Sequence, residues 1–132
     1  AAQAQQEVFH HDAHARIEGL LHPAVLGVAN LPPESTADGD SWLVAASASG
    51  AWSGQQGRVA MRQSGQWLFA DPVEGMRVFD QSARQFVVFT DTWQKPAIPA
   101  EPSGGMYVDS EARAAIGALI SALRAAGVFP SV

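Results

Sequence analysis

All four tryptophans of this chain fall between residues 39 and 93, and each follows a cluster of turn-forming residues. The clusters are Gly39-Asp40-Ser41 before Trp42, Ser49-Gly50-Ala51 before Trp52, Ser64-Gly65-Gln66 before Trp67, and Thr90-Asp91-Thr92 before Trp93. Small residues supply positive φ at the corners, and a large aromatic residue near a strand start can cover a neighbouring strand. Short apolar runs separate the clusters. The stretch therefore predicts an antiparallel β-meander.

The apolar runs predict about six short strands, which is a common sheet size. They lie at 24–29, 41–46, 58–62, 66–71, 76–79 and 85–90, and the first of them is also compatible with an extension of the preceding helix. The third and fourth runs are joined by Gln63-Ser64-Gly65, a short hairpin turn, and the last two pair across 80–83. Both faces of 41–46 are apolar, so we expect both to be covered, one by a helix and the other by another chain.

A helix is predicted at each end of the chain. Residues 1–21 combine Ala, Gln and Glu with apolar side chains on one face, and His22-Pro23 ends that helix. Residues 110–126 form the second helix, with Asp109 as N-cap and Gly127 just past its end. The predicted fold class is α+β: an N-terminal helix, the meander and a C-terminal amphipathic helix.

The C-terminal helix carries a coiled-coil pattern. Ala112, Ile116, Leu119, Leu123 and Ala126 recur at alternating spacings of four and three, and Ile120 widens the stripe. Residues 95–108 before it are rich in Pro and Gly and predict a stiff, extended linker. The sequence thus divides into 1–94 (helix plus tryptophan-rich meander), 95–108 (linker) and 109–132 (an oligomerisation helix). The predicted contact residues are Ala112, Ile116, Leu119, Ile120 and Leu123.

The composition and charge of the chain restrict the classes of partner it is expected to bind. The chain of 132 residues is 47% hydrophobic and only 16% charged, which predicts one globular domain with some surface covered by a partner chain. A net charge of -5 without a basic cluster argues against nucleic acid. No apolar run reaches the length needed for membrane insertion, and no signal peptide is recognisable. The first residue, Ala1, suggests a processed chain or a piece of a longer protein.

The candidates for chemistry are weak. His10 and His14 lie one helical turn apart and could share a metal, but zinc catalysis usually takes three protein ligands, so a solvated helix face is favoured and no metal or cofactor is expected. No serine sits in Gly-x-Ser-x-Gly, and acidic pairs such as Asp71 and Glu74 fall in turns, where such residues are common. A non-enzymatic protein is predicted.

The tryptophans divide into two kinds. Trp52 lies in a Gly- and Ser-rich loop near Gln55 and Gln56, so we expect an exposed ring that stacks on a sugar while the amides bind hydroxyls. Trp42, Trp67 and Trp93 begin or flank strands. They are expected in the core or between subunits, because large aromatics occupy cores more often than binding sites.

Several short motifs, taken together in order, resemble one family. They are Ala2-Gln3-Ala4-Gln5-Gln6-Glu7, His10, Asp12-Ala13, Ile17-Glu18, Pro32-Pro33, Gly39-Asp40-Ser41-Trp42-Leu43-Val44, Gly50-Ala51-Trp52-Ser53-Gly54, Gly65-Gln66-Trp67 and Pro72-Val73-Glu74-Gly75. They resemble the domain of unknown function 2793 family, found in phage-derived proteins of Alphaproteobacteria, including prophages and gene transfer agents. The segments 104–113 and 122–127 resemble the helix that often follows it. The chain departs from the pattern at Gln6, where Lys is usual, and at His11, where Asn is usual.

The resemblance implies a virion structural role in tail fibres or surface spikes that contact the host, with no enzyme activity and no established site residues. The leading hypothesis is a structural and adhesion module of a phage-like particle. It would be made in the bacterial cytoplasm and assembled as a homotrimer with other virion or tail proteins. The alternative is an independent carbohydrate-binding module that recognises host-surface polysaccharide through Trp52.

Overall fold

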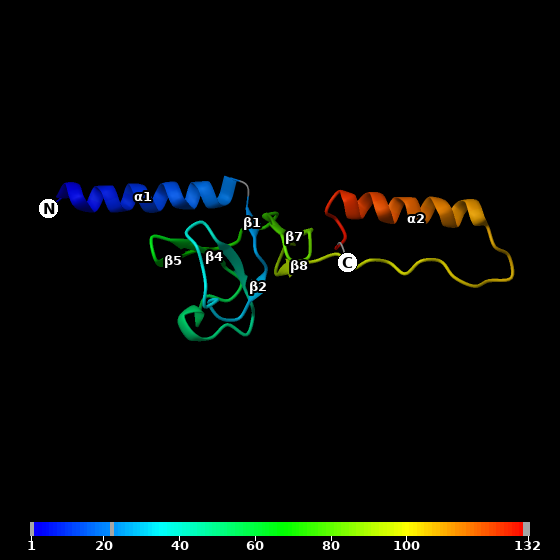
Figure 1. The fold of residues 1–132 in the computed structure, drawn as a ribbon, viewed down its shortest axis with the longest axis horizontal. Coiled ribbons are helices and arrows are strands. Elements are labelled where there is room, and N and C mark those ends of the chain that lie inside the picture. The colour runs from blue at the N-terminus through cyan, green and yellow to red at the C-terminus, as the bar shows by residue number, and fades with distance from the viewer. Residues whose placement is uncertain (1, 22, 131–132) are drawn as a thin grey trace.

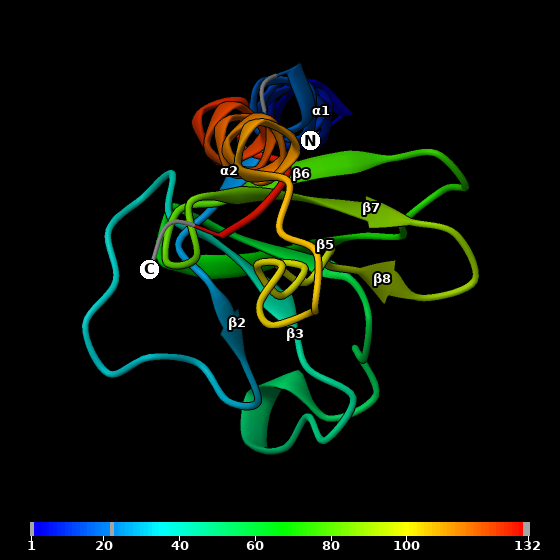
Figure 2. The same ribbon diagram turned by 90° about the vertical axis from the view of Figure 1, so that its right-hand side faces the viewer.

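The computed structural model describes residues 2–21 and 23–130, and it confirms the predicted α+β class. Helix α1 (Ala2–Leu21) and helix α2 (Ser110–Ala125) flank eight short strands. The strands form a central body, and the two helices project from it in opposite directions (Figure 1). Viewed along the long axis, both helices lie over the same edge of the strands (Figure 2). Neither helix is both long and apolar enough to cross a bilayer.

The strands form two sheets of four rather than one meander. Sheet A has the order β1-β6-β7-β8, and its strands are Ala24–Val25, Arg77–Asp80, Gln85–Phe89 and Trp93–Gln94. Sheet B has the order β2-β3-β4-β5, and its strands are Val28–Ala29, Ser41–Val44, Val59–Gln63 and Gln66–Ala70. Each sheet contains a run of three antiparallel strands, so the predicted hairpins are confirmed within each half.

The segment predicted as one strand, 24–29, is divided between the sheets. Its first half, β1, pairs in parallel with β6, and its second half, β2, pairs in parallel with β3. Backbone hydrogen bonds continue both ladders, from Gln81 N to Val25 O at 2.9 Å and from Leu43 N to Gly27 O at 3.0 Å. The prediction of an all-antiparallel meander is therefore wrong, because this segment closes one edge of both sheets.

The inner faces of the two sheets share one apolar core. Its buried members come from both sheets and are Val25, Leu43, Val59, Met61, Ala70, Val78 and Val87. Aliphatic side chains alternate with outward residues along each strand, which is the expected arrangement for two packed sheets. The residues 23–94 that carry these sheets are called the β body below.

The outer face of sheet B is covered by the chain's own loop. Trp42 and Val44 point outward, and the 3₁₀ turn Gly50–Trp52 folds the ring of Trp52 over them. Trp67 completes the group, with its ring centre 5.0 Å from that of Trp52 in an edge-on arrangement. Both faces of β3 are buried, as predicted, but the covers are the other sheet and this loop rather than a helix and a second chain.

Residues 95–130 form a projecting arm. Residues 95–109 are extended and contain no helix or strand, and α2 then returns beside them (Figure 1). The predicted N-cap is confirmed, because Asp109 Oδ1 accepts a hydrogen bond from Ala112 N at 2.9 Å. The guanidinium of Arg113 donates to the carbonyls of Pro102 and Gly104, which holds the extended segment against the helix.

The predicted oligomerisation residues of α2 do not all face solvent. Ala112, Ile116 and Leu119 are exposed, and Leu123 is half-buried. Ile120 is only 4% exposed and is buried within the single chain. Its predicted place in an intermolecular seam is therefore wrong, because its side chain is already buried by its own chain.

Candidate functional site

The structure contradicts the predicted exposure of Trp52. Its side chain is 0% exposed, packed against Trp42 and Trp67 on the outer face of sheet B. Ala60 lies beneath this group and is also fully buried, so a small residue in β4 leaves room for the indole. The glycine-rich loop bends sharply, but it turns the Trp52 ring toward sheet B instead of toward solvent. A ring in this position offers no face to a sugar.

A cavity of about 620 Å³ opens between the two sheets at the end of the β body. We call it the inter-sheet pocket. Both sheets and the loops between them contribute to its walls, which are lined by Val28, Leu43, Val44, Ala45, Ala46, Gln56, Gly57, Arg58, Asp71, Pro72, Phe89, Asp91, Thr92, Trp93 and Lys95. Its lining combines an apolar interior with a few polar groups, which is the usual composition of a small-molecule site.

Trp93 is the fixed aromatic wall of this pocket. Its Nε1 donates a 2.7 Å hydrogen bond to Gly57 O, which joins sheet A to the loop before β4. Phe89 packs edge-on against it at 5.2 Å between ring centres. Because the ring is held at two points and remains half-exposed, it is a preorganised surface for a flat ligand.

Polar side chains stand at the rim of the pocket. Arg58 Nε lies 2.7 Å from Asp71 Oδ1, and Arg58 Nη1 donates to Gln55 Oε1 at 2.7 Å. Gln56 lines the pocket, whereas Gln55 orients Arg58. Ligand binding by these two glutamines stays a prediction, now centred on Trp93 instead of Trp52.

Sequence reasoning placed Trp93 in the core or between subunits. Trp93 does pack against the apolar core, but its position at the pocket was missed. The available sequence signal was the polar pair Asp91-Thr92, which immediately precedes Trp93 at the start of the last strand. Strand β8 is only two residues long, so it was too short to be detected by periodicity.

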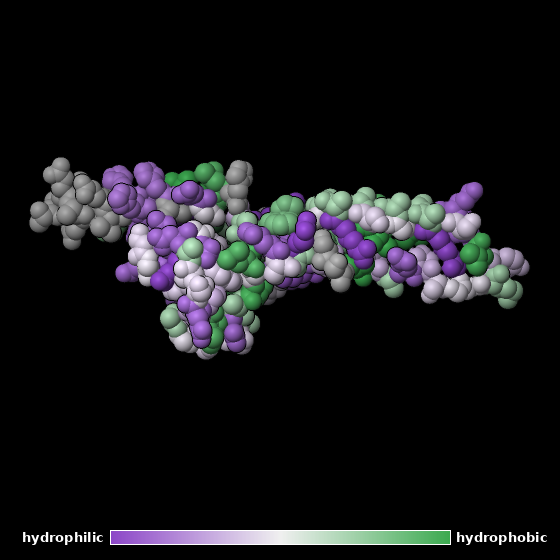
Figure 3. Space-filling model, viewed as in Figure 1, coloured by the Kyte–Doolittle hydropathy of each residue, from purple (hydrophilic) through white to green (hydrophobic). Residues whose placement is uncertain are grey.

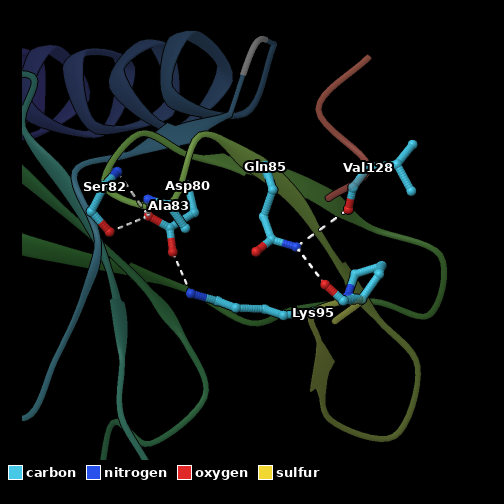
Figure 4. A network of polar contacts seen from close by, with 7 residues as sticks. Asp80, Ser82, Ala83, Gln85, Lys95 and Val128 are labelled. Atoms are coloured by element: carbon cyan, nitrogen blue, oxygen red, sulfur yellow. Dashed lines mark hydrogen bonds and ion pairs between the residues drawn. The ribbon is translucent and has the colours of Figure 1, made fainter. Parts of the chain in front are cut away.

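A second cluster, the polar clasp, fastens both ends of the arm to sheet A (Figure 4). Asp80 accepts hydrogen bonds from Ser82 and Ala83 and pairs with Lys95, the first residue of the arm. The neighbouring Gln85 Nε2 donates to Pro96 O at 3.1 Å and to Val128 O at 3.3 Å. One side chain thus joins the segment that leaves the sheet to the segment that returns after α2.

The clasp keeps Asp80 ionised although its side chain is fully buried. Burial by itself raises the pKa of this carboxyl, but the hydrogen bonds from Lys95, Ser82 and Ala83 and the positive charge of Lys95 outweigh it, so that the pKa lies below its ordinary 3.8. A charge at this position stabilises the fold only while both partners remain in place.

The arm presents large apolar side chains to solvent, and apolar atoms lie along α2 and at the tip of the arm (Figure 3). Met106 and Tyr107 at the tip are more than nine-tenths exposed. Val108, Ile116 and Leu119 are between 42% and 61% exposed. These five residues are called the arm surface below. Several large apolar side chains exposed on one projecting element are typical of a protein interface.

The histidines of α1 lie apart from both features. His10 and His14 are exposed, and His14 borders a cavity of about 710 Å³ with His11, Asp12 and Glu18. Among the side chains that the structure describes (9–14, 16–21 and 23–130), those of His, Cys, Asp and Glu form no group of three or more placed to hold a metal ion. These side chains supply no third ligand beside His10 and His14, and a shared metal stays a prediction.

A comparison with known protein families finds a match that includes the β body. A family model described as "Protein of unknown function (DUF2793)" matches residues 10–94, which is more than half of the chain. The chain belongs to the DUF2793 family. None of the curated proteins matches it.

The matched residues contain both sheets, the tryptophan cluster and most of the inter-sheet pocket. In this DUF2793 protein the match ends at Gln94, immediately before Lys95 of the polar clasp. The arm therefore lies beyond the matched residues, and the clasp is where it joins the family's β body.

Proposed function

We propose that this DUF2793 protein is a non-enzymatic structural and adhesion module of a phage-like particle, in a tail fibre or surface spike, that assembles as a homotrimer. The observation that carries the proposal is the arm surface. The role in a phage-like particle rests on the sequence resemblance to phage-derived proteins, and the trimer rests on analogy with fibres.

The arm surface suits contact with another protein because it is both apolar and held in place. Five large side chains are exposed on one projecting element. Full burial of a fully exposed side chain of this size is worth roughly 1.5–3 kcal/mol, and the partly exposed Val108, Ile116 and Leu119 would gain a fraction of that. The polar clasp fixes the base of the element at Gln85, so less motion is lost when a partner binds.

Further copies of this chain are the proposed partners. The spacing of Ala112, Ile116 and Leu119 follows the coiled-coil pattern, and all three side chains are exposed. Two heptads give little affinity alone. Tyr107 and Met106, at the tip beside the start of α2, would extend the contact beyond the helix.

The test is the mass of the protein in solution. Sedimentation velocity or mass photometry at micromolar concentration is expected to give three times the 13.9 kDa of one chain. The double variant Ile116→Asp, Leu119→Asp places two charges in the seam, which should yield monomers. Val73→Asp is a matched control, because Val73 is similarly exposed at 67% but lies in the β body.

A 13.9 kDa monomer of the unmodified protein under these conditions would contradict assembly through the arm. So would a trimer that survives the double variant. If Val73→Asp also dissociates the assembly, the contact lies in the β body and the arm assignment is wrong.

A second function, glycan recognition at the inter-sheet pocket, is favoured by the anchored ring of Trp93. An aromatic face beside carboxylate and amide groups suits a sugar ring with its hydroxyls. Asp91 and Gln56 are among the exposed polar side chains that line this pocket.

A glycan array with the unmodified protein and three variants tests this function. Trp93→Ala and Asp91→Ala should lose the signal, whereas Trp93→Phe keeps a ring and should retain part of it. Asp91→Ala is expected to fold normally, because Asp91 is an exposed residue of a turn, so a lost signal in this variant cannot be attributed to misfolding. Absence of binding by the unmodified protein would leave assembly as the better account of the module.

A further inference from the structure

A cavity of about 310 Å³ lies where the C-terminal end of α2 meets sheet A, apart from the inter-sheet pocket. We call it the arginine pocket. Its lining consists of two arginines, two phenylalanines and the turn that ends α2, namely Phe79, Arg84, Phe86, Arg124, Ala125, Ala126 and Gly127. None of the described residues in this lining is acidic, so two positive charges border one small cavity.

Arg124 contributes a buried nitrogen that has no partner. Its Nε is shielded from solvent and has no hydrogen-bond partner in the described part of the chain. Attraction between Arg124 and the C-terminal end of α2 explains a positive charge here. It does not explain a buried donor without an acceptor, which is costly and uncommon in folded proteins.

Arg84 is placed at the cavity by an unfavourable backbone conformation. It has φ of 54°, in the left-handed region that glycine adopts at little cost. Asp80 already organises this turn through Ser82 and Ala83, so glycine at residue 84 would complete it with less strain. Strain of this kind is often retained where a side chain has a functional role. Within the part of the chain whose side chains are described (9–14, 16–21 and 23–130), the Arg84 side chain makes no hydrogen bond or ion pair.

An aromatic wall completes the arginine pocket. Phe79 and Phe86 pack edge-on, with ring centres 5.1 Å apart, and Phe86 remains 42% exposed. Gly127 approaches both rings so closely that an added Cβ would lie 3.2 Å from each. The hydrogen bond from Phe86 N to Gly127 O, at 2.6 Å, fixes the end of α2 against β7.

We propose that the arginine pocket binds a small soluble molecule that carries an oxyanion group, with the oxyanion between Arg84 and Arg124 and its body against Phe79 and Phe86. Guanidinium groups bind carboxylate, sulfate and phosphate through paired, charge-assisted hydrogen bonds. An oxyanion there would supply the acceptor that Arg124 Nε lacks and would relieve the repulsion between the two arginines. The volume admits a ligand about the size of a sugar acid or a benzoate.

Isothermal titration calorimetry at constant ionic strength tests the proposal with four probes: glucuronate, benzoate, inorganic sulfate and neutral glucose. Glucuronate or benzoate is expected to bind saturably and more tightly than sulfate, because only those two also contact the aromatic wall. Glucose should not bind at this site. Absence of saturable binding by all three anions would overturn the proposal, and sulfate binding as tightly as both organic anions would overturn the role of the wall.

Three variants locate the binding. Arg84→Gly should weaken the organic anion at least about tenfold and raise the melting temperature, because it removes a charge and relieves strain together. Arg124→Gln should weaken binding by a similar factor. Arg77→Gln is the matched control, since Arg77 is an exposed arginine of β6 outside this lining, and its affinity should not change. Unchanged affinity in Arg84→Gly would overturn the assignment even if Arg124→Gln fails to fold.

Discussion

Sheets A and B have the same arrangement of strands, but the contacts that each makes with the rest of the chain differ. Each consists of three antiparallel strands with a parallel strand from 24–29 at one edge. Sheet B is completed by an aromatic group from its own loop, with Trp52 buried between Trp42 and Trp67. Sheet A is completed by polar contacts to a distant segment, through Asp80 and Gln85.

The apolar cluster mainly stabilises sheet B, whereas the polar contacts of sheet A fix where the arm attaches. An apolar cluster gains most of its energy from burial and does not require a specific geometry at one bond. A buried carboxylate and amide stabilise the fold only when each partner is in its place, which defines where the arm leaves and returns. Sheet B is therefore the self-contained half, and sheet A is the half that positions the arm.

The largest expected effect is in sheet B. Trp52→Ala should lower the free energy of unfolding by about 3–5 kcal/mol, because it leaves a cavity among rings that cannot close around it. Urea denaturation followed by circular dichroism measures the change. Trp52→Phe should cost clearly less, since the Trp52 Nε1 has no hydrogen-bond partner in the described structure. A loss below about 1 kcal/mol for Trp52→Ala would show that the ring is not buried in solution.

In sheet A the clasp should be sensitive to both mutation and pH. Asp80→Asn should cost about 2 kcal/mol near neutral pH, less than for a fully buried pair because Lys95 reaches solvent. The pKa of Asp80 is lowered in the folded state, so its stabilisation is complete above the unfolded pKa of about 3.9 and is lost as pH falls through the folded pKa.

The difference in stability between the unmodified protein and Asp80→Asn should therefore shrink as pH falls below about 4. Denaturation curves at a series of pH values measure it. A difference that stays constant down to the acid end would contradict an ionised Asp80 in the clasp.

The contact between the arm and sheet A can be tested at a glycine. Gly127→Ala should cost about 2 kcal/mol, because φ is 71° and the new Cβ would press on Phe79 and Phe86. Gly75→Ala shares the positive φ, at 84°, but meets open space, so it should cost only about 1 kcal/mol. Melting temperatures of both variants give the comparison. Equal losses would indicate that α2 does not rest on these rings.

The smallest effect is expected at the exposed ion pair of the inter-sheet pocket. Asp71→Asn should change stability by no more than about 0–1 kcal/mol, because the Asp71 side chain is 74% exposed. The same measurements as for Asp80→Asn provide the contrast between an exposed and a buried carboxylate. A loss as large as that of Asp80→Asn would mean that the Arg58–Asp71 pair has a structural role similar to that of the clasp.

Local patterns predicted the local structure well. The hairpin around Gly65, the pairing of β6 with β7 and the Asp109 cap all depend on neighbouring residues, and all three are confirmed. The division of 24–29 depends on partners far along the chain, at Phe79 and Leu43, which no periodicity reveals. The same limit explains Ile120, whose helical spacing suggests a seam but whose burial depends on contacts from outside its own helix.

The candidate site was predicted less well than the fold. Composition identified the loop around Trp52 correctly but could not tell on which side of the loop the ring would lie. That depends on Ala60, a small residue on a neighbouring strand, and on Trp67 beside it. Trp93 forms the pocket wall through a hydrogen bond to Gly57, a contact between segments that the sequence does not connect.

The segment 24–29 also has a consequence for the dynamics of the molecule. Because Val25 belongs to one sheet and Val28, three residues later, to the other, opening either sheet displaces the short segment that holds an edge strand of the other sheet. The buried amide hydrogens of β3 and β6 should therefore exchange with solvent deuterium through the same opening reaction. Two sheets of four strands would then behave as one cooperative unit.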